Sequence, residues 1–478
     1  MTRESATLIT LLFYMVALIA IGWVTHRRTR NAVDFYLAGR NLGPTVAAIS
    51  AAASSSSVWT LLGVSGAAYT FGLSSLWLFP GCVGGFVLNW YVVAGPLRNW
   101  SHQKGAVTIT EIIAGPRNRP LNRVISTICA LIVLVCLGAY VAAQFQGAGK
   151  TFNQTFDWSL TYSILLASGI VMAYTLLGGF WAVSLTDTLQ GMIMVLAAVA
   201  VPATALIGVG GPFGLVEGLR QIDAPGYMSL TRNLPAASAL GFIMGLLGIG
   251  LGYPGQPHVV NRLMALRKGE NTLRKAQRIA IAWAVIVFAG MLLLGLSGRI
   301  LFPDLRDPEV IFLTVTNAYM HPVVAGILIA AVVSAIMSTA DSQLLVAGSA
   351  VTNDLRLGGT SSKTLLLRSR LVVVVISGCA VMAALLGNRQ IFSQVLFAFS
   401  AMGSAFGPVL LVTLMAGEVK PRHTLLSILF GFGLSTIAFF LFPEPETKGL
   451  ERVVPFLFAL LIAWSGRRGP EIKTSSQP

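Results

Sequence analysis

The sequence predicts an all-α membrane protein with about thirteen transmembrane helices, and two features carry that prediction. Of its 478 residues, 55% are hydrophobic and only 11% are charged, whereas a soluble globular chain carries about 25% charged residues. The apolar residues also gather into runs of about 20 residues, the length that crosses a bilayer as a helix. The longest loops, about 209–236 and 298–321, are too short for a soluble domain, so we expect residues 1–478 to form a single transmembrane domain in a lipid bilayer.

The expected spans follow the apolar runs and end at polar or basic breaks. The first run is kept as a span because Arg3 is the only basic residue before it and no cleavage site follows it. We number the spans one to thirteen in chain order: 6–25, 43–70, 75–97, 124–147, 159–177, 184–208, 237–256, 279–297, 322–351, 371–387, 391–416, 424–442 and 450–466.

Basic residues are unevenly distributed between the two sides of these spans. If the loop after span one is cytoplasmic, 24 of the 33 lysines and arginines lie on the cytoplasmic side. Cytoplasmic loops carry the basic excess in membrane proteins, so we expect an outside N-terminus and an inside C-terminus in the cell (inner) membrane. The net charge of +15 is then a topology signal, and no nucleic acid is expected as a partner.

Cysteines and histidines give no indication of an enzyme or a metal centre. The four cysteines lie inside apolar runs, and the five histidines lie near span ends or in loops. Neither set has the spacing of metal ligands or of a disulfide framework. We therefore expect a protein that is not an enzyme.

Span nine carries polar residues on one helical face. Ser334, Ser338, Asp341 and Ser342 recur at i, i+4, i+7 and i+8, with Thr339 on the flank. Helix–helix packing alone would explain the hydroxyl residues, because small polar residues are common where membrane helices meet. A carboxylate at this depth is costly unless it faces protein, water or an ion. We therefore interpret the stretch that includes Asp341 and Ser342 as half of a cation site, the alternative being that Asp341 pairs with a neighbour for packing only.

Two spans contain sequences that disfavour a continuous helix. Span two holds four consecutive serines, Ser54 to Ser57, and span seven holds alternating glycines before Pro254 and Pro257. Each of these spans begins a block of five, which gives repeats over 43–208 and 237–416. Interrupted helices at corresponding positions of two halves indicate an inverted-repeat transporter with a site in mid-membrane. A kink without a ligand is the alternative for either stretch alone.

Asp187 places a second carboxylate near the cytoplasmic start of span six. It is a candidate cation ligand. The alternative is an acid at a helix N-terminus, stabilised there by the helix dipole and the free amide groups.

With these residues identified, the chain resembles the sodium/solute symporter family, most closely its sodium/proline-symporter-like branch, from about residue 34 to 418. The resemblance implies a LeuT-type fold of two inverted five-helix repeats, with one extra helix before them and two after. It also implies coupling of inward Na⁺ flow to solute uptake. The stretches that carry it are Phe35-Tyr36-Leu37-Ala38-Gly39-Arg40, Trp59 to Gly63, Gly178-Gly179-Phe180 with Thr186-Asp187, Gly255-Gln256-Pro257-His258 and Met337-Ser338-Thr339.

The resemblance also implies where the coupling ion binds. The main sodium site would use the backbone carbonyls of Ala53, Ser56 and Ala335 together with the hydroxyls of Ser338 and Thr339. An all-oxygen shell of this kind suits a hard cation. Asp187 resembles a family acid that is linked to sodium handling and, in some members, to a second sodium site.

The solute pocket implied by the resemblance is lined by residues of spans two, four and seven. They are Trp59, Gly63, Tyr140, Tyr253 and Pro257. Outside the family context, Trp59 and Tyr140 are equally explained by aromatic packing between helices.

The chain departs from the proline branch at three positions. Ser55 stands where that branch has an aspartate, and Asp341 stands where it has a small polar residue, so the two appear exchanged. Ile249 replaces a tryptophan in the span-seven break. The first change puts the usual cation arrangement in question, and the last puts proline in question as the solute.

These observations together predict a Na⁺-coupled secondary active symporter. We expect it to import a small organic solute, an amino acid such as proline or a carboxylate, by alternating access. The alternatives are a solute-sensing membrane module, which the lack of a soluble domain after span thirteen disfavours, and an H⁺-coupled symporter of the same fold.

Overall fold

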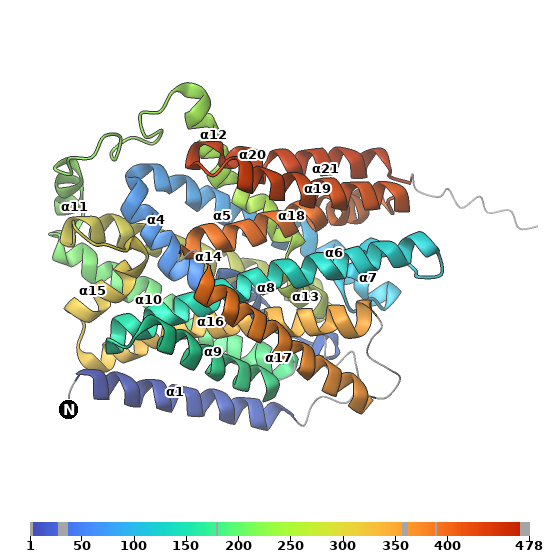
Figure 1. Ribbon diagram of the computed structural model, residues 1–478, viewed down its shortest axis with the longest axis horizontal. Coiled ribbons are helices and arrows are strands. Elements are labelled where there is room, and N and C mark those ends of the chain that lie inside the picture. Colours follow the sequence, from blue (N-terminus) through green and yellow to red (C-terminus); the bar gives the residue numbers. More distant parts are fainter. Residues whose placement is uncertain (1–2, 27–36, 178–179, 356–361, 388–389, 469–478) are drawn as a thin grey trace, which may run out of the picture.

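The computed structural model is helical, with its elements arranged as one bundle (Figure 1). Its described part contains no named strand, only the isolated bridges Leu42–Leu266 and Val419–Arg467. Of the family stretches, Phe35, Tyr36, Gly178 and Gly179 lie outside the described residues. The structure describes residues 3–26, 37–177, 180–355, 362–387 and 390–468.

The helices follow the apolar runs of the sequence, and short 3-10 or π turns, labelled η, interrupt several of them. In the first half they are α1 (Arg3–His26), η1 (Ala38–Arg40), α3 (Pro44–Val58), η2 (Trp59–Gly63), α4 (Val64–Phe71), η3 (Gly72–Trp77), α5 (Leu78–Val87), η4 (Leu88–Val93), α6 (Ala94–Lys104), α7 (Ile109–Ala114), α8 (Pro120–Phe156), α9 (Leu160–Leu177), α10 (Phe180–Gly208) and α11 (Gly211–Arg220). In the second half they are α12 (Ala236–Leu247), η5 (Gly248–Gly255), α13 (Pro257–Ala265), α14 (Glu270–Leu301), η6 (Pro308–Val310), α15 (Ile311–Tyr319), α16 (Pro322–Ser349), η7 (Ala350–Asp354), α17 (Ser362–Leu386), α18 (Ile391–Ala416), α19 (Pro421–Leu441), η8 (Pro445–Thr447), α20 (Lys448–Arg452) and α21 (Val454–Ser465).

Within the described residues, 9 helical segments are long and apolar enough to cross a membrane. One of them, Pro44–Lys104, contains both span two and span three. The apolar parts of α1 and α9 are shorter, and span thirteen corresponds to α20 and α21. The helical, membrane-spanning fold class is confirmed.

Span two breaks where the serine run predicts. Ser57 has φ 41°, in the left-handed region, next to the last residue of α3 and shortly before the π turn η2. The Val58 N–H donates to the side chain of Gln144 at 3.1 Å from Oε1, and the Trp59 N–H, which also reaches the Ser56 and Ser57 carbonyls, donates to Ser57 Oγ at 3.1 Å. The break is therefore satisfied by polar side chains, as a break inside a membrane must be.

Span seven breaks at its glycines and proline. Helix α12 gives way to the 3-10 turn η5, and Gln256 is extended before α13 begins. Close packing of η5 on α18 requires glycine, since a Cβ on Gly403 would lie 2.5 Å from the Gly252 Cα. The sequence places the end of span seven at residue 256, so a loop is expected from residue 257 onward, but the structure has a helix there. Pro257 opens α13, a buried half-helix, because proline suits the first helical position.

Helix α16 lies in the interior of the bundle. Of the residues in its most apolar stretch, 83% are buried inside the protein. The corresponding share is 33% in α19 and 28% in α17. It packs against α10, α8, α1 and α3, while α1 forms one edge of the bundle and α19 and α21 form the opposite edge (Figure 1). The polar face of α16 therefore faces protein and not lipid.

Candidate functional site

The polar face of α16 meets the broken helix α3 through oxygen atoms. The Ser338 hydroxyl donates to the Ala53 carbonyl at 3.4 Å and to the Ala335 carbonyl at 3.3 Å. The Thr339 hydroxyl donates to the Ser54 carbonyl at 3.2 Å. All five residues are buried, and we call them the α3–α16 oxygen group. Of the expected sodium ligands, the Ala53 and Ala335 carbonyls thus both lie within hydrogen-bond distance of the Ser338 hydroxyl, and Thr339 is the next residue on α16.

Ser56, another expected ligand, is placed differently. Its carbonyl oxygen accepts the N–H of Trp59 at the end of α3. Its hydroxyl is buried without a hydrogen-bond partner in the described part of the chain. The Ser56 carbonyl therefore already accepts one hydrogen bond, and the Ser56 hydroxyl is an additional buried oxygen at this position.

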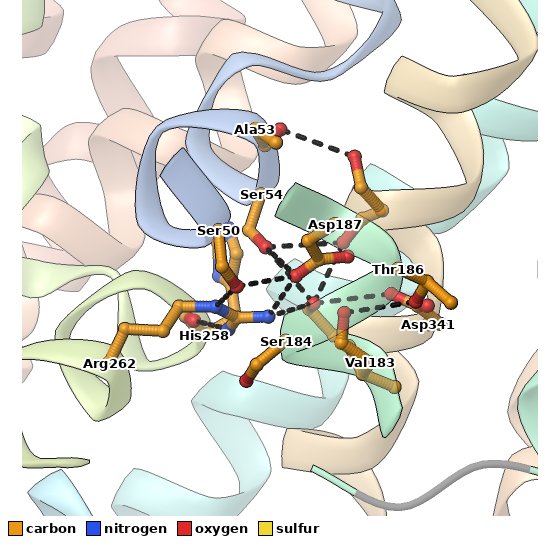
Figure 2. A network of polar contacts seen from close by, with 12 residues as sticks. Ser50, Ala53, Ser54, Val183, Ser184, Thr186, Asp187, His258, Arg262 and Asp341 are labelled. Atoms are coloured by element: carbon orange, nitrogen blue, oxygen red, sulfur yellow. Dashed lines mark hydrogen bonds and ion pairs between the residues drawn. The ribbon is translucent and has the colours of Figure 1, made fainter. Parts of the chain in front are cut away.

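Asp187 forms a buried ion pair with Arg262 of α13. The Arg262 Nη2 lies 2.7 Å from Asp187 Oδ2, and neither side chain is more than 1% exposed. The same carboxylate oxygen accepts the hydroxyls of Ser50 at 2.7 Å and Ser54 at 3.1 Å (Figure 2). Asp187 is therefore not a solvated helix-end acid, because it is held by side chains from α3 and α13.

Ser54 connects the ion pair to the α3–α16 oxygen group. Its hydroxyl lies 3.1 Å from Asp187 Oδ2, 3.2 Å from the Ser338 carbonyl and 3.1 Å from the Ser342 hydroxyl. Ser342 in turn donates to the Ser338 carbonyl at 2.7 Å and accepts from Arg262 Nη2 at 2.5 Å. The sequence-predicted ligands on α16 and the acid on α10 therefore belong to one continuous polar network.

Asp341 adds a second carboxylate to this network. Its Oδ1 accepts the Ser342 hydroxyl at 3.2 Å, and its Oδ2 is buried without a hydrogen-bond partner in the described residues. Ser55 does not take part in these contacts, since its hydroxyl donates to the Ala52 carbonyl of its own helix at 2.9 Å. The serine of span two that touches the carboxylates is Ser54.

The expected solute residues lie at the two helix breaks. The Trp59 ring stacks on Phe392 with centroids 5.9 Å apart and lies so close to Gly63 that a Cβ there would be 3.0 Å from the indole. The Tyr140 hydroxyl donates to Ser57 Oγ at 3.3 Å, directly at the α3 break. Trp59, Gly63 and Tyr140 therefore surround one point of the bundle.

Tyr253 and Pro257 belong to the other break. The Tyr253 ring packs against Phe86 at 5.2 Å and Phe399 at 5.1 Å, and Pro257 begins α13. Phe86 reaches Phe288, which also contacts Trp59, so one aromatic cluster joins the two breaks.

Sequence reasoning missed several residues of these sites. In the sequence, Arg262 falls in the loop after span seven, and the only signal for it is its position four residues after the histidine of the Gly-Gln-Pro-His stretch. The amide of Gln144 and the four phenylalanines that line the breaks gave no local signal. These phenylalanines are Phe86, Phe288, Phe392 and Phe399.

Lys150, Asp307 and Glu309 form an ion-pair group near the start of α18. Lys150 Nζ of α8 lies 2.6 Å from Glu309 Oε2 and 2.8 Å from Asp307 Oδ2. The Glu309 carboxylate also accepts the N–H groups of Ile391 at 3.1 Å and Phe392 at 2.8 Å, which are free amides at a helix start. Because Phe392 stacks on Trp59, this group lies next to one of the expected solute residues.

A family profile and the sequences of known relatives point to one protein family. The profile of the Sodium:solute symporter family matches residues 35–431. The osmoregulated proline transporter OpuE of Bacillus subtilis is 34% identical over 467 residues, covering 95% of this chain and 93% of the relative. The high-affinity proline transporter PutP of the same organism is 36% identical over 423 residues, covering 87% and 88%. A Na⁺-coupled sialic acid symporter, solved in a substrate-bound outward-open state, shares the fold with a TM-score of 0.76 at 17% identity over 96% of this chain and 97% of its own.

Proposed function

The chain belongs to the sodium:solute symporter family, and we propose that the solute it imports is an amino acid, such as proline, or a related carboxylate. It is a Na⁺-coupled secondary active symporter of the cell membrane, and it is a transporter and not an enzyme. The relatives named above are proline transporters, which supports an amino acid as the solute.

The observation that carries the sodium site is the contact between Ser338 and two backbone carbonyls from different helices. Hydroxyl and carbonyl oxygens of Ala53, Ala335, Ser338 and Thr339 converge where α3 meets α16. Oxygen ligands with few charges suit Na⁺. A sodium ion at this point would join the broken helix to α16.

The unpaired polar atoms near the α3 break favour a solute with hydrogen-bond acceptors. Both Trp59 Nε1 and Gln144 Nε2 are buried donors without a partner in the described residues. Each such donor costs free energy until an acceptor reaches it, and a carboxylate oxygen would satisfy it. The aromatic cluster beside these donors provides an apolar surface for the rest of a small solute.

The presence of Ile249 argues against free proline as a tightly bound solute. It lies in η5 and is buried, at the position where the proline branch is expected to carry a tryptophan. The smaller side chain changes the shape of the wall between the breaks, so proline would be a weak or secondary solute.

Alternating access would use the network as the link between ion and solute. Sodium at the α3–α16 oxygen group stabilises one arrangement of α3, and that arrangement shapes the pocket around Trp59 and Tyr140. Each ligand then binds better when the other is present. The Lys150–Glu309 group would close one end of the pathway in part of the cycle.

The finer architecture is part of the same proposal. Thirteen spans would be arranged as inverted repeats over 43–208 and 237–416, with one helix before them and two after, the N-terminus outside and the C-terminus inside. Reporter fusions between α13 and α14 should report a cytoplasmic location, and fusions between α11 and α12 an external one. The opposite pattern would remove the repeat assignment.

Uptake into proteoliposomes tests the function directly. A panel of amino acids and carboxylates is supplied under an imposed Na⁺ gradient or an imposed H⁺ gradient. Accumulation that depends on the Na⁺ gradient supports the proposal, and accumulation driven only by H⁺ refutes sodium coupling. Solute binding without accumulation would instead indicate a sensing module.

A further inference from the structure

Arg452 is a buried cation at the end of α20, a part of the chain that neither proposed site includes. The elements η8 and α20 pack against α12 (Figure 1), and Arg452 is 5% exposed. Its Nη1 donates to the Gly245 carbonyl of α12 at 2.8 Å. Gly245 lies near the middle of the apolar segment Ala236–Gly255. A guanidinium at such a place is costly unless protein groups receive it, and here a backbone carbonyl does.

The carbonyl that Arg452 contacts belongs to the break of span seven. Helix α12 ends at Leu247, and the carbonyls in the last turn of a helix lose their helical hydrogen-bond partners. The helix dipole also places partial negative charge at that end, which a guanidinium stabilises. Arg452 therefore caps the end of α12, and η5, with Ile249 and Tyr253, follows directly.

A face of glycines brings the backbone of α12 against the same segment. Gly241, Gly245 and Gly248 recur at i, i+4 and i+7. A Cβ on Gly245 would lie 2.7 Å from the Lys448 Cβ, and one on Gly248 would lie 3.1 Å from the Arg452 Cβ. The packing leaves little space for larger side chains on this face, so it sets the distance between α12 and Arg452.

The turn η5 is also held from its other side. A Cβ on Gly81 of α5 would lie 2.4 Å from the Leu246 carbonyl oxygen, and a Cβ on Gly85 would lie 2.2 Å from the Tyr253 ring. The end of α12 and the start of η5 therefore lie between α5 and α20. A shift of α12 away from Arg452 would move Tyr253 and Ile249 with it.

The helix that carries Arg452 has a second, independent attachment. The Glu451 carboxylate lies 3.9 Å from Arg452 Nε through Oε1 and 2.7 Å from Lys448 Nζ through Oε2. The Glu451 backbone carbonyl accepts the Ser435 hydroxyl of α19 at 3.1 Å. A neutral hydrogen bond thus joins α20 to α19, whereas the guanidinium joins it to α12, and each contact can be removed without the other.

We propose that Arg452 is a positioning residue for solute binding: it holds the end of α12 and so fixes η5, the wall of the solute pocket that carries Ile249 and Tyr253. The inference rests on the proposed solute pocket and adds to it a role for the helices that follow α18. The alternative is that Arg452 only stabilises the folded bundle. A positioning role changes the solute concentration for half-maximal uptake, whereas a loss of folded carrier lowers only the maximal rate.

The test compares the wild type with Arg452→Gln in proteoliposomes under an imposed Na⁺ gradient. The probes are radiolabelled L-proline, L-alanine, L-glutamate and pyruvate, and the probe that the wild type accumulates most is titrated. We expect Arg452→Gln to raise its half-saturation concentration roughly tenfold. Binding of radioactive sodium to solute-free Arg452→Gln should equal that of the wild type, because the α3–α16 oxygen group lies at the other helix break.

Two further variants separate positioning from general damage. Arg452→Lys keeps a positively charged donor and should recover most of the solute affinity. Ser435→Ala is the matched control, because it removes the hydrogen bond between α19 and α20 and leaves the guanidinium on the Gly245 carbonyl. It should keep the wild-type half-saturation concentration.

The outcomes distinguish this inference from the proposed function. A wild-type half-saturation concentration in folded Arg452→Gln, or an equal increase in Ser435→Ala, would overturn the positioning role. If Arg452→Gln does not fold, Arg452→Met takes its place, since an apolar side chain suits a buried site; if neither folds, Arg452 supports the whole bundle and the positioning role is refuted. A wild type that accumulates none of the four probes would instead refute the proposed solute class on which the inference rests.

Discussion

Removal of the Ser338 hydroxyl is the most direct test of the sodium site. This hydroxyl is buried and lies 3.4 Å from the Ala53 carbonyl and 3.3 Å from the Ala335 carbonyl. Ser338→Ala removes one oxygen from a small shell and leaves the two carbonyls in place. We expect a change in sodium dependence and not in solute affinity, because the proposed solute residues lie at the helix breaks.

The size of the effect follows from the strength of one contact to a charged partner. Such a contact contributes about 1.5–3 kcal/mol, and about 1.4 kcal/mol corresponds to a factor of ten in affinity. Ser338→Ala should therefore raise the Na⁺ concentration for half-maximal uptake roughly 10- to 100-fold. Thr339→Ala should act in the same direction, since its hydroxyl reaches the adjacent Ser54 carbonyl at 3.2 Å.

The assay is uptake into proteoliposomes over a range of Na⁺ concentrations, followed by solute titration at saturating Na⁺. Ser334→Ala is the matched control, because its hydroxyl lies one turn earlier on α16 and bonds Tyr14 and the Ala330 carbonyl instead. The control should keep the wild-type sodium dependence. Unchanged sodium dependence in both Ser338→Ala and Thr339→Ala would refute the site.

Three further predictions follow from neighbouring features. Asp341→Ser should abolish Na⁺-driven uptake in folded protein, because it removes a negative charge one turn from the proposed sodium ligand Ser338; normal uptake in this variant would exclude Asp341 from coupling. Proline should bind weakly to the wild type and more tightly to Ile249→Trp, as measured by equilibrium binding of labelled proline, and tight Na⁺-dependent proline binding by the wild type would contradict this expectation. Glu309→Gln should slow uptake several-fold while leaving sodium binding in place, because it weakens the buried pair with Lys150 and the hold on the start of α18; an unchanged uptake rate would show that the group only stabilises the fold.

The sequence alone determined the features that depend on local composition. The length of its apolar runs predicts helices that span a membrane, and the structure has such helices. The serine run of span two and the glycines of span seven predict helix breaks, and the structure breaks at Ser57 and at η5. These predictions succeed because helix propensity and backbone hydrogen bonding are decided by residues close together in the chain. The same local reading correctly placed Ser338 and Asp341 on one buried face of α16.

Only the tertiary structure decided which charged and polar groups meet. Arg262 reads as a loop arginine in the sequence, yet it lies buried against Asp187, 75 positions away in the chain. Lys150 and Glu309 are separated by 159 positions and form one ion pair. Such pairings depend on how whole helices pack, because the energy of a buried charge is fixed by the groups that surround it and not by its sequence neighbours. For this reason the broken helices and the polar face of α16 could be read from the chain, whereas the cation that faces Asp187 could not.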